Sequence, residues 1–208
     1  KMIAGNWKMH KTVSEAIELA EDIVMETNGT LNEVVIFPTF TALESVADAI
    51  DGKHVGYGAQ DLHWEDAGAY TGAISGAMIA DICAEYVLVG HSERRALFGD
   101  NEAVVAKKMV AAYRNGLKPM LCVGENLEER EAGKTARKIA MQLRNALRVI
   151  TAEQAESLVV AYEPVWAIGT GKTATAEDAD KTIGYIRSLI KKTFGAEVGK
   201  KLRIQYGG

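Results

Sequence analysis

Short apolar segments alternate with longer segments of mixed apolar and polar residues along the whole chain. The short segments are rich in β-branched residues and almost continuously apolar, which is typical of strands covered on both faces. This alternation predicts repeated strand–helix units around a parallel sheet. Seven strands are expected, at residues 2–6, 34–37, 55–59, 86–90, 120–123, 158–162 and 203–206.

Several of the intervening segments begin with residues that favour helix N-termini. In a capping box, the side chain of the first residue accepts a hydrogen bond from the backbone amide three positions later. The side chain at that later position accepts a hydrogen bond from the backbone amide of the first residue. Such pairs are predicted at Thr12 with Glu15 and at Thr41 with Glu44, and single N-caps at Asn101 and Thr175. The segments that follow these residues are therefore expected to be helices that cover the sheet.

The alternation fits either a doubly wound open sheet or an eight-stranded barrel. The residues just after the strands favour the barrel, because they are polar or reactive and a barrel gathers them at one mouth. These residues are Asn6, Lys8, Gln60, His91 and Glu163. We therefore predict an α/β fold of the TIM (β/α)8 barrel class, with about seven βα units in a single domain over residues 1–208.

Composition supports one globular domain. The 208 residues are 48% hydrophobic and 25% charged, which allows a substantial buried core. The apolar runs are far shorter than the roughly 20 residues that a membrane-crossing helix needs, so no membrane partner is expected. The formal net charge is -4, so the chain lacks the excess of basic residues that is typical of nucleic-acid binders, and no nucleic-acid partner is expected.

The beginning of the chain and its cysteines bear on the cellular compartment. The N-terminal segment lacks the basic stretch, long apolar region and cleavage site of a secretory signal. The two cysteines, Cys83 and Cys122, lie in apolar sequence, which argues against a disulfide framework or a metal cluster. A cytoplasmic location is therefore expected.

Two residues that directly follow strands could take part in proton transfer. Glu163 precedes Pro164, which restricts the glutamate backbone, so Glu163 is a candidate general base. A glutamate in this position could instead be a structural partner of an arginine. His91 precedes an expected short helix, whose partial positive charge disfavours a second proton on the ring. A neutral His91 could polarise a carbonyl, although a histidine in a turn could also be solvated or structural.

A third candidate follows the first strand. Lys8 lies between Trp7 and Met9, where its ammonium could attract an anionic substrate and stabilise developing negative charge. Asn6 could hold the ammonium or a substrate oxygen by hydrogen bonding, and Glu93 is a possible partner of Lys8. The alternative is that Lys8 is an ordinary solvated lysine.

The segment 164–173 has the features of a flap, with a stiff proline start and a glycine-containing tip. Its end, Gly171 to Thr173, resembles part of a nucleotide-binding loop. The match fails because Trp166 stands where that loop requires a glycine. We interpret the segment as a lid in which the backbone N–H of Gly169 binds a phosphate and Ile168 excludes water.

Six segments of this chain, taken in order and at these spacings, resemble the triosephosphate isomerase family, and the match extends over essentially the whole chain. The segments are Gly5-Asn6-Trp7-Lys8-Met9, Gly58-Ala59-Gln60, Tyr70-Thr71-Gly72, Gly90-His91-Ser92-Glu93-Arg94-Arg95, Cys122-Val123-Gly124-Glu125 and the run from Ala161 to Thr173.

The resemblance implies a reaction and roles for individual residues. The reaction interconverts dihydroxyacetone phosphate and glyceraldehyde 3-phosphate through an enediolate, with no metal and no organic cofactor. Glu163 is implied as the base, His91 as the electrophile, and Lys8 with Asn6 as the electrostatic and substrate-binding pair. Further substrate-binding positions are implied at Glu93, Ile168, Gly169, Gly207 and Gly208.

The resemblance also implies a homodimer and a further C-terminal βα unit in the family pattern. Gln60 and Thr71 are expected at the dimer interface, and the segment 61–75 resembles the loop that inserts beside the neighbouring active site. The chain stops at Gly208, where the family pattern continues for roughly one more βα unit. A catalytically silent barrel fragment is therefore an alternative to an active isomerase, and another phosphate-binding barrel enzyme is a third interpretation.

Overall fold

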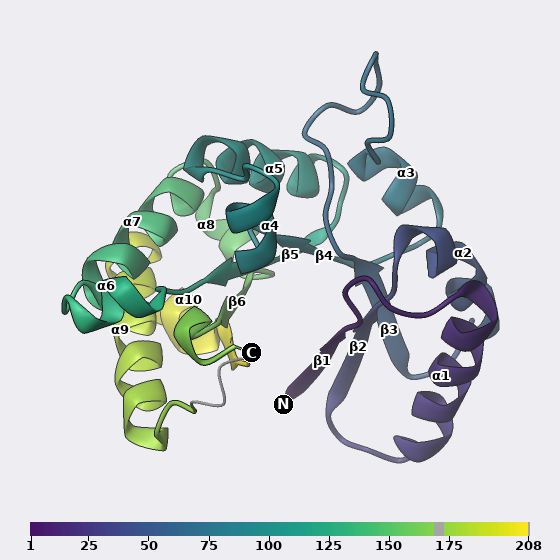
Figure 1. Ribbon diagram of the computed structural model, residues 1–208, viewed down its shortest axis with the longest axis horizontal. Helices are drawn as coiled ribbons and strands as arrows, with labels where there is room; N and C mark the ends of the chain where they lie inside the picture. Colours follow the sequence, from purple (N-terminus) through teal and green to yellow (C-terminus); the bar gives the residue numbers. More distant parts are fainter. Residues whose placement is uncertain (169–172, 208) are drawn as a thin grey trace. The chain divides into compact units, whose positions relative to one another are not determined.

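The computed structural model describes residues 1–168 and 173–207 (Figure 1). Its seven strands confirm the expected number. The bounds of the first, third and seventh agree with the prediction, and the other four differ by one or two residues at one end. The strands are β1 (Met2–Asn6), β2 (Glu33–Phe37), β3 (Val55–Ala59), β4 (Tyr86–Val89), β5 (Lys118–Val123), β6 (Val159–Tyr162) and β7 (Arg203–Tyr206).

Helices fill the segments between the strands. They are α1 (Val13–Glu26), α2 (Phe40–Ala49), α3 (Gly76–Asp81), α4 (Ser92–Leu97), α5 (Glu102–Arg114), α6 (Leu127–Glu131), α7 (Thr135–Leu147), α8 (Ala152–Ala155), the 3₁₀ turn η1 (Val165–Ala167), α9 (Ala176–Phe194) and α10 (Ala196–Lys201). Within residues 1–168 and 173–207, no helix is long and apolar enough to cross a membrane.

The predicted helix caps are largely confirmed. Thr12 and Glu15 form the expected box, in which the Thr12 amide donates to Glu15 Oε2 at 2.8 Å. Asn101 Oδ1 accepts from two backbone amides of the first turn of α5, and Thr175 Oγ1 caps α9. The capping box at Thr41 was wrong, because Thr39 is the N-cap of α2 and Thr41 lies inside the helix. Starting one residue after Thr39 lets α2 bury an apolar stripe that comprises Ala42, Leu43, Val46 and Ala47.

The chain divides into two compact units. The first comprises Lys1–Leu88 and Ala111–Lys118. In this unit β1 pairs with β2, β2 with β3 and β3 with β4, all in parallel. A doubly wound sheet would instead place β1 in its interior, beside a later strand. The strand order that follows the chain confirms the TIM-barrel class of fold.

The core of the first unit lies between its strands and two helices. Ala16 and Ala20 of α1 and Val46 of α2 are fully buried and belong to the same apolar cluster as Val34 and Ile36 of β2. Figure 1 shows α1 and α2 side by side, and α1 contributes its two buried alanines to this cluster. Small residues on α1 allow the helix to approach the sheet closely.

The second unit comprises Val89–Val110 and Pro119–Gly208, of which residues 169–172 and 208 are not described. Here β5, β6 and β7 pair in parallel and in chain order, with Met120 opposite Val159 and Val159 opposite Arg203. Leu121 and Val160 of the adjacent strands are fully buried. Ile139 of α7 and Ile186 of α9 are also fully buried, as expected for helices that cover a parallel sheet.

A buried ion pair links α4, α5 and the turn between them. Lys108 of α5 is 3% exposed, and its Nζ lies 2.6 Å from Oδ2 of Asp100. Arg94 of α4 places Nε 3.3 Å from the same oxygen. A buried carboxylate is stable only when it is paired, so this cluster constrains the position of α4.

We expect Lys108→Met to lower the free energy of unfolding by about 3 kcal/mol, because the buried Asp100 carboxylate loses its shortest ion pair. Urea denaturation followed by circular dichroism measures the change. Lys107→Met is the matched control, since Lys107 is an exposed lysine of the same helix and its replacement should change stability by less than about 0.5 kcal/mol. Equal stability of the two variants would show that the buried pair is not a structural requirement.

Candidate active site

In the first unit, the segment after β1 is held in an unusual backbone conformation. Lys8 has a φ angle of 53°, which is rare for a residue with a side chain and must be stabilised by its surroundings. The Lys8 amide donates to Oδ1 of Asn6 at 3.0 Å. Gln60, which follows β3, donates from Nε2 to the carbonyl oxygens of Lys8 at 2.9 Å and Phe37 at 2.8 Å. Asn6 and Gln60 therefore position the backbone that carries the half-buried Lys8.

In the second unit, the structure brings Glu163 and His91 together. Glu163 follows β6 and His91 follows β4, and Nε2 of His91 lies 3.2 Å from Oε1 of Glu163. The other carboxylate oxygen, Oε2, accepts from the backbone amide of Ser92 at 3.3 Å. Both side chains are largely buried, with 8% of His91 and 13% of Glu163 exposed. The two candidates therefore share one space although they are far apart in the sequence.

The hydrogen bonds of His91 determine where its ring proton lies. His91 is the N-cap of α4, and its Nδ1 accepts from the backbone amide of Glu93 at 3.2 Å. A nitrogen that accepts an N–H cannot itself carry a proton, so the proton lies on Nε2, which faces Glu163. The Glu93 carboxylate is 3.6 Å from Nδ1, beyond hydrogen-bonding distance. The arrangement therefore directs a donor N–H of His91 at Glu163.

The backbone of Glu163 is held by a very close approach to β5. Its amide donates to the carbonyl oxygen of Val123 at 2.8 Å. A Cβ atom at Gly124 would overlap the carbonyl oxygen of Glu163, so only glycine fits there. The Gly124 amide in turn donates to Oε1 of the buried Gln142 at 2.9 Å. The position of Glu163 thus depends on the absence of a side chain at Gly124.

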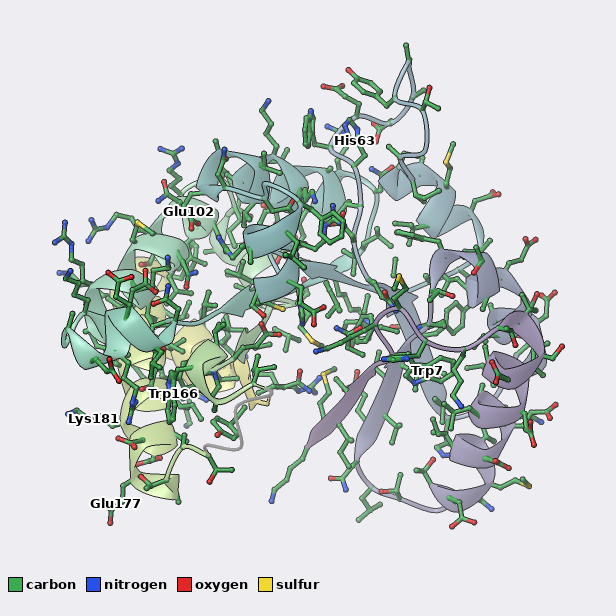
Figure 2. All side chains as sticks on the ribbon, viewed as in Figure 1. Trp7, His63, Glu102, Trp166, Glu177 and Lys181 are labelled. Atoms are coloured by element: carbon green, nitrogen blue, oxygen red, sulfur yellow. The ribbon has the colours of Figure 1, made fainter. Side chains whose placement is uncertain are left out.

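A second buried carboxylate, which the sequence analysis quoted only as part of a motif, anchors the start of the predicted flap. Glu125 is 0% exposed and accepts from the Tyr162 hydroxyl at 3.1 Å and from Nε1 of Trp166 at 3.0 Å. The guanidinium of Arg130 lies 4.1 Å from the Trp166 ring centroid. Burial and the nearby Glu125 carboxylate raise the pKa of the Tyr162 hydroxyl, which therefore stays a donor. Figure 2 shows Trp166 in the second unit, on the 3₁₀ turn that follows Glu163.

The signal for Glu125 was present in the sequence. Glu125 follows the apolar strand β5 at almost the same distance as Glu163 follows β6. A carboxylate that close to a buried strand end is expected either to react or to be bound by buried donors. Which of the two applies depends on the donors that the fold brings to it, and Tyr162 and Trp166 lie 37 and 41 positions away in the chain.

The remaining predicted positions are spread over the two units. Ile168 is half-buried directly after η1, and the amide of Gly207 donates to the carbonyl oxygen of Tyr162 at 3.2 Å. Thr71 is exposed in the segment between β3 and α3. Gly169 and Gly208 lie outside the described residues. In the part of the chain that is described, no group of three or more His, Cys, Asp or Glu side chains is placed to hold a metal ion.

The loop that contains Thr71 is ordered by contacts within the first unit. The ring of His63 stacks on Trp64 at 4.2 Å and lies 4.4 Å from the Tyr70 ring. The Asp66 carboxylate lies 2.8 Å from Nε of Arg114, and this contact lowers the pKa of Asp66. The loop is therefore built on its own aromatic stack and ion pair.

Comparison with known proteins identifies the relatives of this chain. The sequence model of the family described as triosephosphate isomerase matches residues 1–208. A triosephosphate isomerase of Moorella thermoacetica is 52% identical over 207 residues, which cover 100% of this chain and 83% of the relative. Triosephosphate isomerases of Clostridium botulinum (strain Loch Maree) and Alkaliphilus oremlandii are 46% and 49% identical, each over 100% of this chain and 84% of the relative.

We expect Gly124→Ala to lower catalytic turnover by about 10²-fold or more, because the added methyl group displaces the backbone of Glu163. Steady-state kinetics measure the loss, and circular dichroism checks that the variant is folded. Gly184→Ala is the control, since nothing lies within 4 Å of a Cβ at this position in α9 and alanine favours a helix. A Gly124→Ala variant with wild-type turnover would contradict the proposed constraint on Glu163.

Proposed function

Because this chain belongs to the triosephosphate isomerase family, we propose that it interconverts dihydroxyacetone phosphate and D-glyceraldehyde 3-phosphate with Glu163 as base and His91 as electrophile. The proposal needs no metal and no organic cofactor, since both proton-transfer groups come from the chain. The 3.2 Å contact between His91 Nε2 and Glu163 Oε1 is the observation that carries it. Two residues with complementary proposed roles, far apart in the sequence, meet at the ends of two strands.

The proton moves between two adjacent carbons of the substrate. The Glu163 carboxylate removes a proton from the carbon beside the carbonyl, and the electron pair of that C–H bond forms the carbon–carbon double bond of an enediolate. Negative charge develops on the former carbonyl oxygen, where the Nε2–H of His91 donates a hydrogen bond. The proton of the original hydroxyl group moves to the former carbonyl oxygen, and Glu163 returns its proton to the former carbonyl carbon, so that the carbonyl group forms again on the neighbouring carbon. The Nδ1 contact with the Glu93 amide supports this role, because it keeps the ring proton on Nε2.

The observed position of Glu163 is a resting position in this proposal. Base and electrophile act on the substrate from different sides, yet here they touch each other and leave no space for a reacting carbon between them. Substrate binding must therefore displace the carboxylate from His91 and from the Ser92 amide. Pro164 and the 3₁₀ turn follow Glu163 directly, so this movement involves the start of the flap.

The other substrate contacts are proposed from the family resemblance. Lys8 supplies positive charge for the phosphate and the developing oxyanion, and Asn6 supports it. Glu93 and Ile168 complete the pocket, the backbone N–H of Gly169 contacts the phosphate, and Gly207 and Gly208 are further substrate-binding positions. The strained backbone at Lys8 supports a functional role for this segment, since such strain is retained mainly where it is used. The suggested pairing of Glu93 with Lys8 stays a prediction.

We also propose that residues 1–208 belong to a single barrel domain and that the protein acts in the cytoplasm as a homodimer. The interface would include Gln60 and Thr71. The loop 61–75 supports this, because its aromatic stack and the Asp66–Arg114 pair order it in advance and reduce the entropy cost of association. Gln60 also has an internal role, since it bonds the backbone of Lys8.

We expect Glu163→Asp to lower kcat by about 10²-fold while the melting temperature stays close to wild type, because the shorter side chain misplaces the carboxylate. A coupled isomerase assay in both directions measures turnover. Glu177→Asp is the control, because Glu177 points away from the molecule at the start of α9 (Figure 2). Near-normal turnover of Glu163→Asp would refute the assignment of Glu163 as the base. A wild-type chain that is folded and has the full mass but shows no turnover would support the alternative of a catalytically silent barrel.

We expect wild-type chain to have the mass of two copies in light scattering, and Thr71→Arg to have the mass of one. A long charged side chain at an exposed loop tip opposes close packing against a second copy. Thr193→Arg is the control, since Thr193 is an exposed residue of α9 and its replacement should leave the dimer intact. A wild-type monomer, or a dimeric Thr71→Arg variant, would show that this loop does not form the interface.

A further inference from the structure

Arg95 of α4 is a largely buried cation to which the proposed reaction assigns no role. Its side chain is 14% exposed, and it lies one helical turn after His91, the N-cap of the same helix. An arginine is costly to bury unless its guanidinium is paired and its N–H groups find acceptors. The acceptors that Arg95 reaches therefore indicate what this side chain does in the second unit.

Arg95 bonds the carbonyl oxygens on both sides of His91. Its Nε donates to the carbonyl oxygen of Gly90 at 2.6 Å, and its backbone amide donates to the carbonyl oxygen of His91 at 3.1 Å. These oxygens belong to the two planar peptide groups that precede and follow the Cα atom of His91. Rotation of either peptide group would break a bond to Arg95. The contacts therefore restrict the backbone from which the imidazole projects.

Gly90 leaves the space that the guanidinium occupies. A Cβ atom at this position would lie 2.8 Å from Nη2 of Arg95 and 3.0 Å from Cγ2 of Val105. Gly90 also has a φ angle of 70°, which favours glycine. The residue before His91 is thus matched to Arg95 both by its backbone conformation and by its lack of a side chain.

The guanidinium also reaches the strand beside the candidate base. Nη2 of Arg95 donates to the carbonyl oxygen of Cys122 on β5 at 3.4 Å, the longest of its contacts. The next residue, Val123, accepts the hydrogen bond from the Glu163 amide at 2.8 Å. One side chain therefore contacts both the residue that precedes the candidate electrophile and the strand that holds the candidate base.

Glu102, at the start of α5 (Figure 2), orients the guanidinium. Its Oε1 lies 2.7 Å from Nη1 of Arg95, and 22% of its side chain is exposed. Its other oxygen, Oε2, is buried and has no hydrogen-bond partner in the part of the chain that is described. The pair with Arg95 is thus the contact that compensates the burial of this carboxylate. A planar guanidinium can present Nη1 to Glu102 and Nε to Gly90 at once, which the single ammonium of a lysine cannot do.

We propose that Arg95, oriented by Glu102, is a positioning residue that aligns the imidazole of His91 with Glu163. It acts through the two peptide groups beside His91 and does not contact the substrate. Its effect on turnover rests on the proposed function, because that effect requires His91 to be the electrophile. Its effect on the ring position does not, because the 3.2 Å contact of His91 with Glu163 is a property of the folded chain.

Arg95→Met and Arg95→Lys test this role in the full chain. Methionine removes every side-chain donor, whereas lysine keeps the charge without the planar fork. We expect kcat to fall by about 10²-fold in Arg95→Met and by about tenfold in Arg95→Lys, with KM changed by less than about twofold. A misplaced electrophile weakens stabilisation of the transition state and leaves substrate binding intact.

Arg144→Met is the matched control, since Arg144 is an exposed arginine of α7 and its replacement should leave kcat at the wild-type value. Glu102→Gln is the conservative variant of the partner. Its amide oxygen can still accept from Nη1 of Arg95, so kcat should stay within about threefold of wild type. Wild-type kcat in both Arg95 variants, a change confined to KM, or an equal loss in Arg144→Met overturns the proposal.

The ring of His91 supplies a measurement that is independent of turnover. The chain has four histidines, and nitrogen-15 NMR of the histidine-labelled protein identifies the His91 signals by their loss in His91→Gln. We expect the Nε2 resonance to shift in both Arg95 variants and to stay in place in Arg144→Met. A shift in Arg95→Lys reports on the position of the ring, because the positive charge is retained.

Circular dichroism checks that each variant is folded, and Arg95→Lys decides the matter if Arg95→Met does not fold. Unchanged His91 resonances in a folded Arg95→Lys variant contradict the proposal. If the wild-type chain has no turnover, the proposed function fails, while the His91 resonances still decide whether Arg95 positions the ring.

Discussion

The close pairing of β5 with β6 is the constraint on which the candidate site depends. The amide of Glu163 donates to Val123, and Gly124 has no side chain where the carbonyl of Glu163 lies. A carboxylate that must remove a proton has to be placed to within a fraction of an ångström, and backbone contacts achieve this better than side-chain contacts. The glycine therefore determines the position of the candidate base Glu163, although it has no reactive side chain.

Buried polar groups extend this constraint to the surrounding elements. Gln142 bonds the Gly124 amide from α7, and Glu125 gathers Tyr162 and Trp166 on either side of Glu163. The pair of Asp100 with Lys108 holds α4, whose N-cap is His91. Each of these groups is costly to bury alone, so each specifies one arrangement of the elements that it joins. Precision in the second unit thus comes from satisfied polar contacts added to an apolar core.

In the first unit, hydrogen bonds to the backbone hold the candidate residue Lys8 in place. Lys8 is kept in a left-handed backbone conformation by Asn6 and by the amide of Gln60, which bonds two carbonyl oxygens at once. Gln60 was selected from the sequence because it follows a strand and because the family resemblance implied an interface role. The internal hydrogen bonds supply a reason for a glutamine there that is independent of any partner.

The sequence by itself determined the seven strands, their parallel type and most of the helix caps, because hydrophobic periodicity and N-cap chemistry are local properties. It also selected His91 and Glu163 as candidates, since a reactive side chain directly after an apolar strand is a local signal, and the structure places the two side chains in contact. Only the tertiary structure decided that Thr39 rather than Thr41 begins α2, because the choice depends on which apolar residues the core accepts. It alone showed the contacts of Glu125 and the contact between His91 and Glu163, because these depend on residues that the chain brings together only on folding.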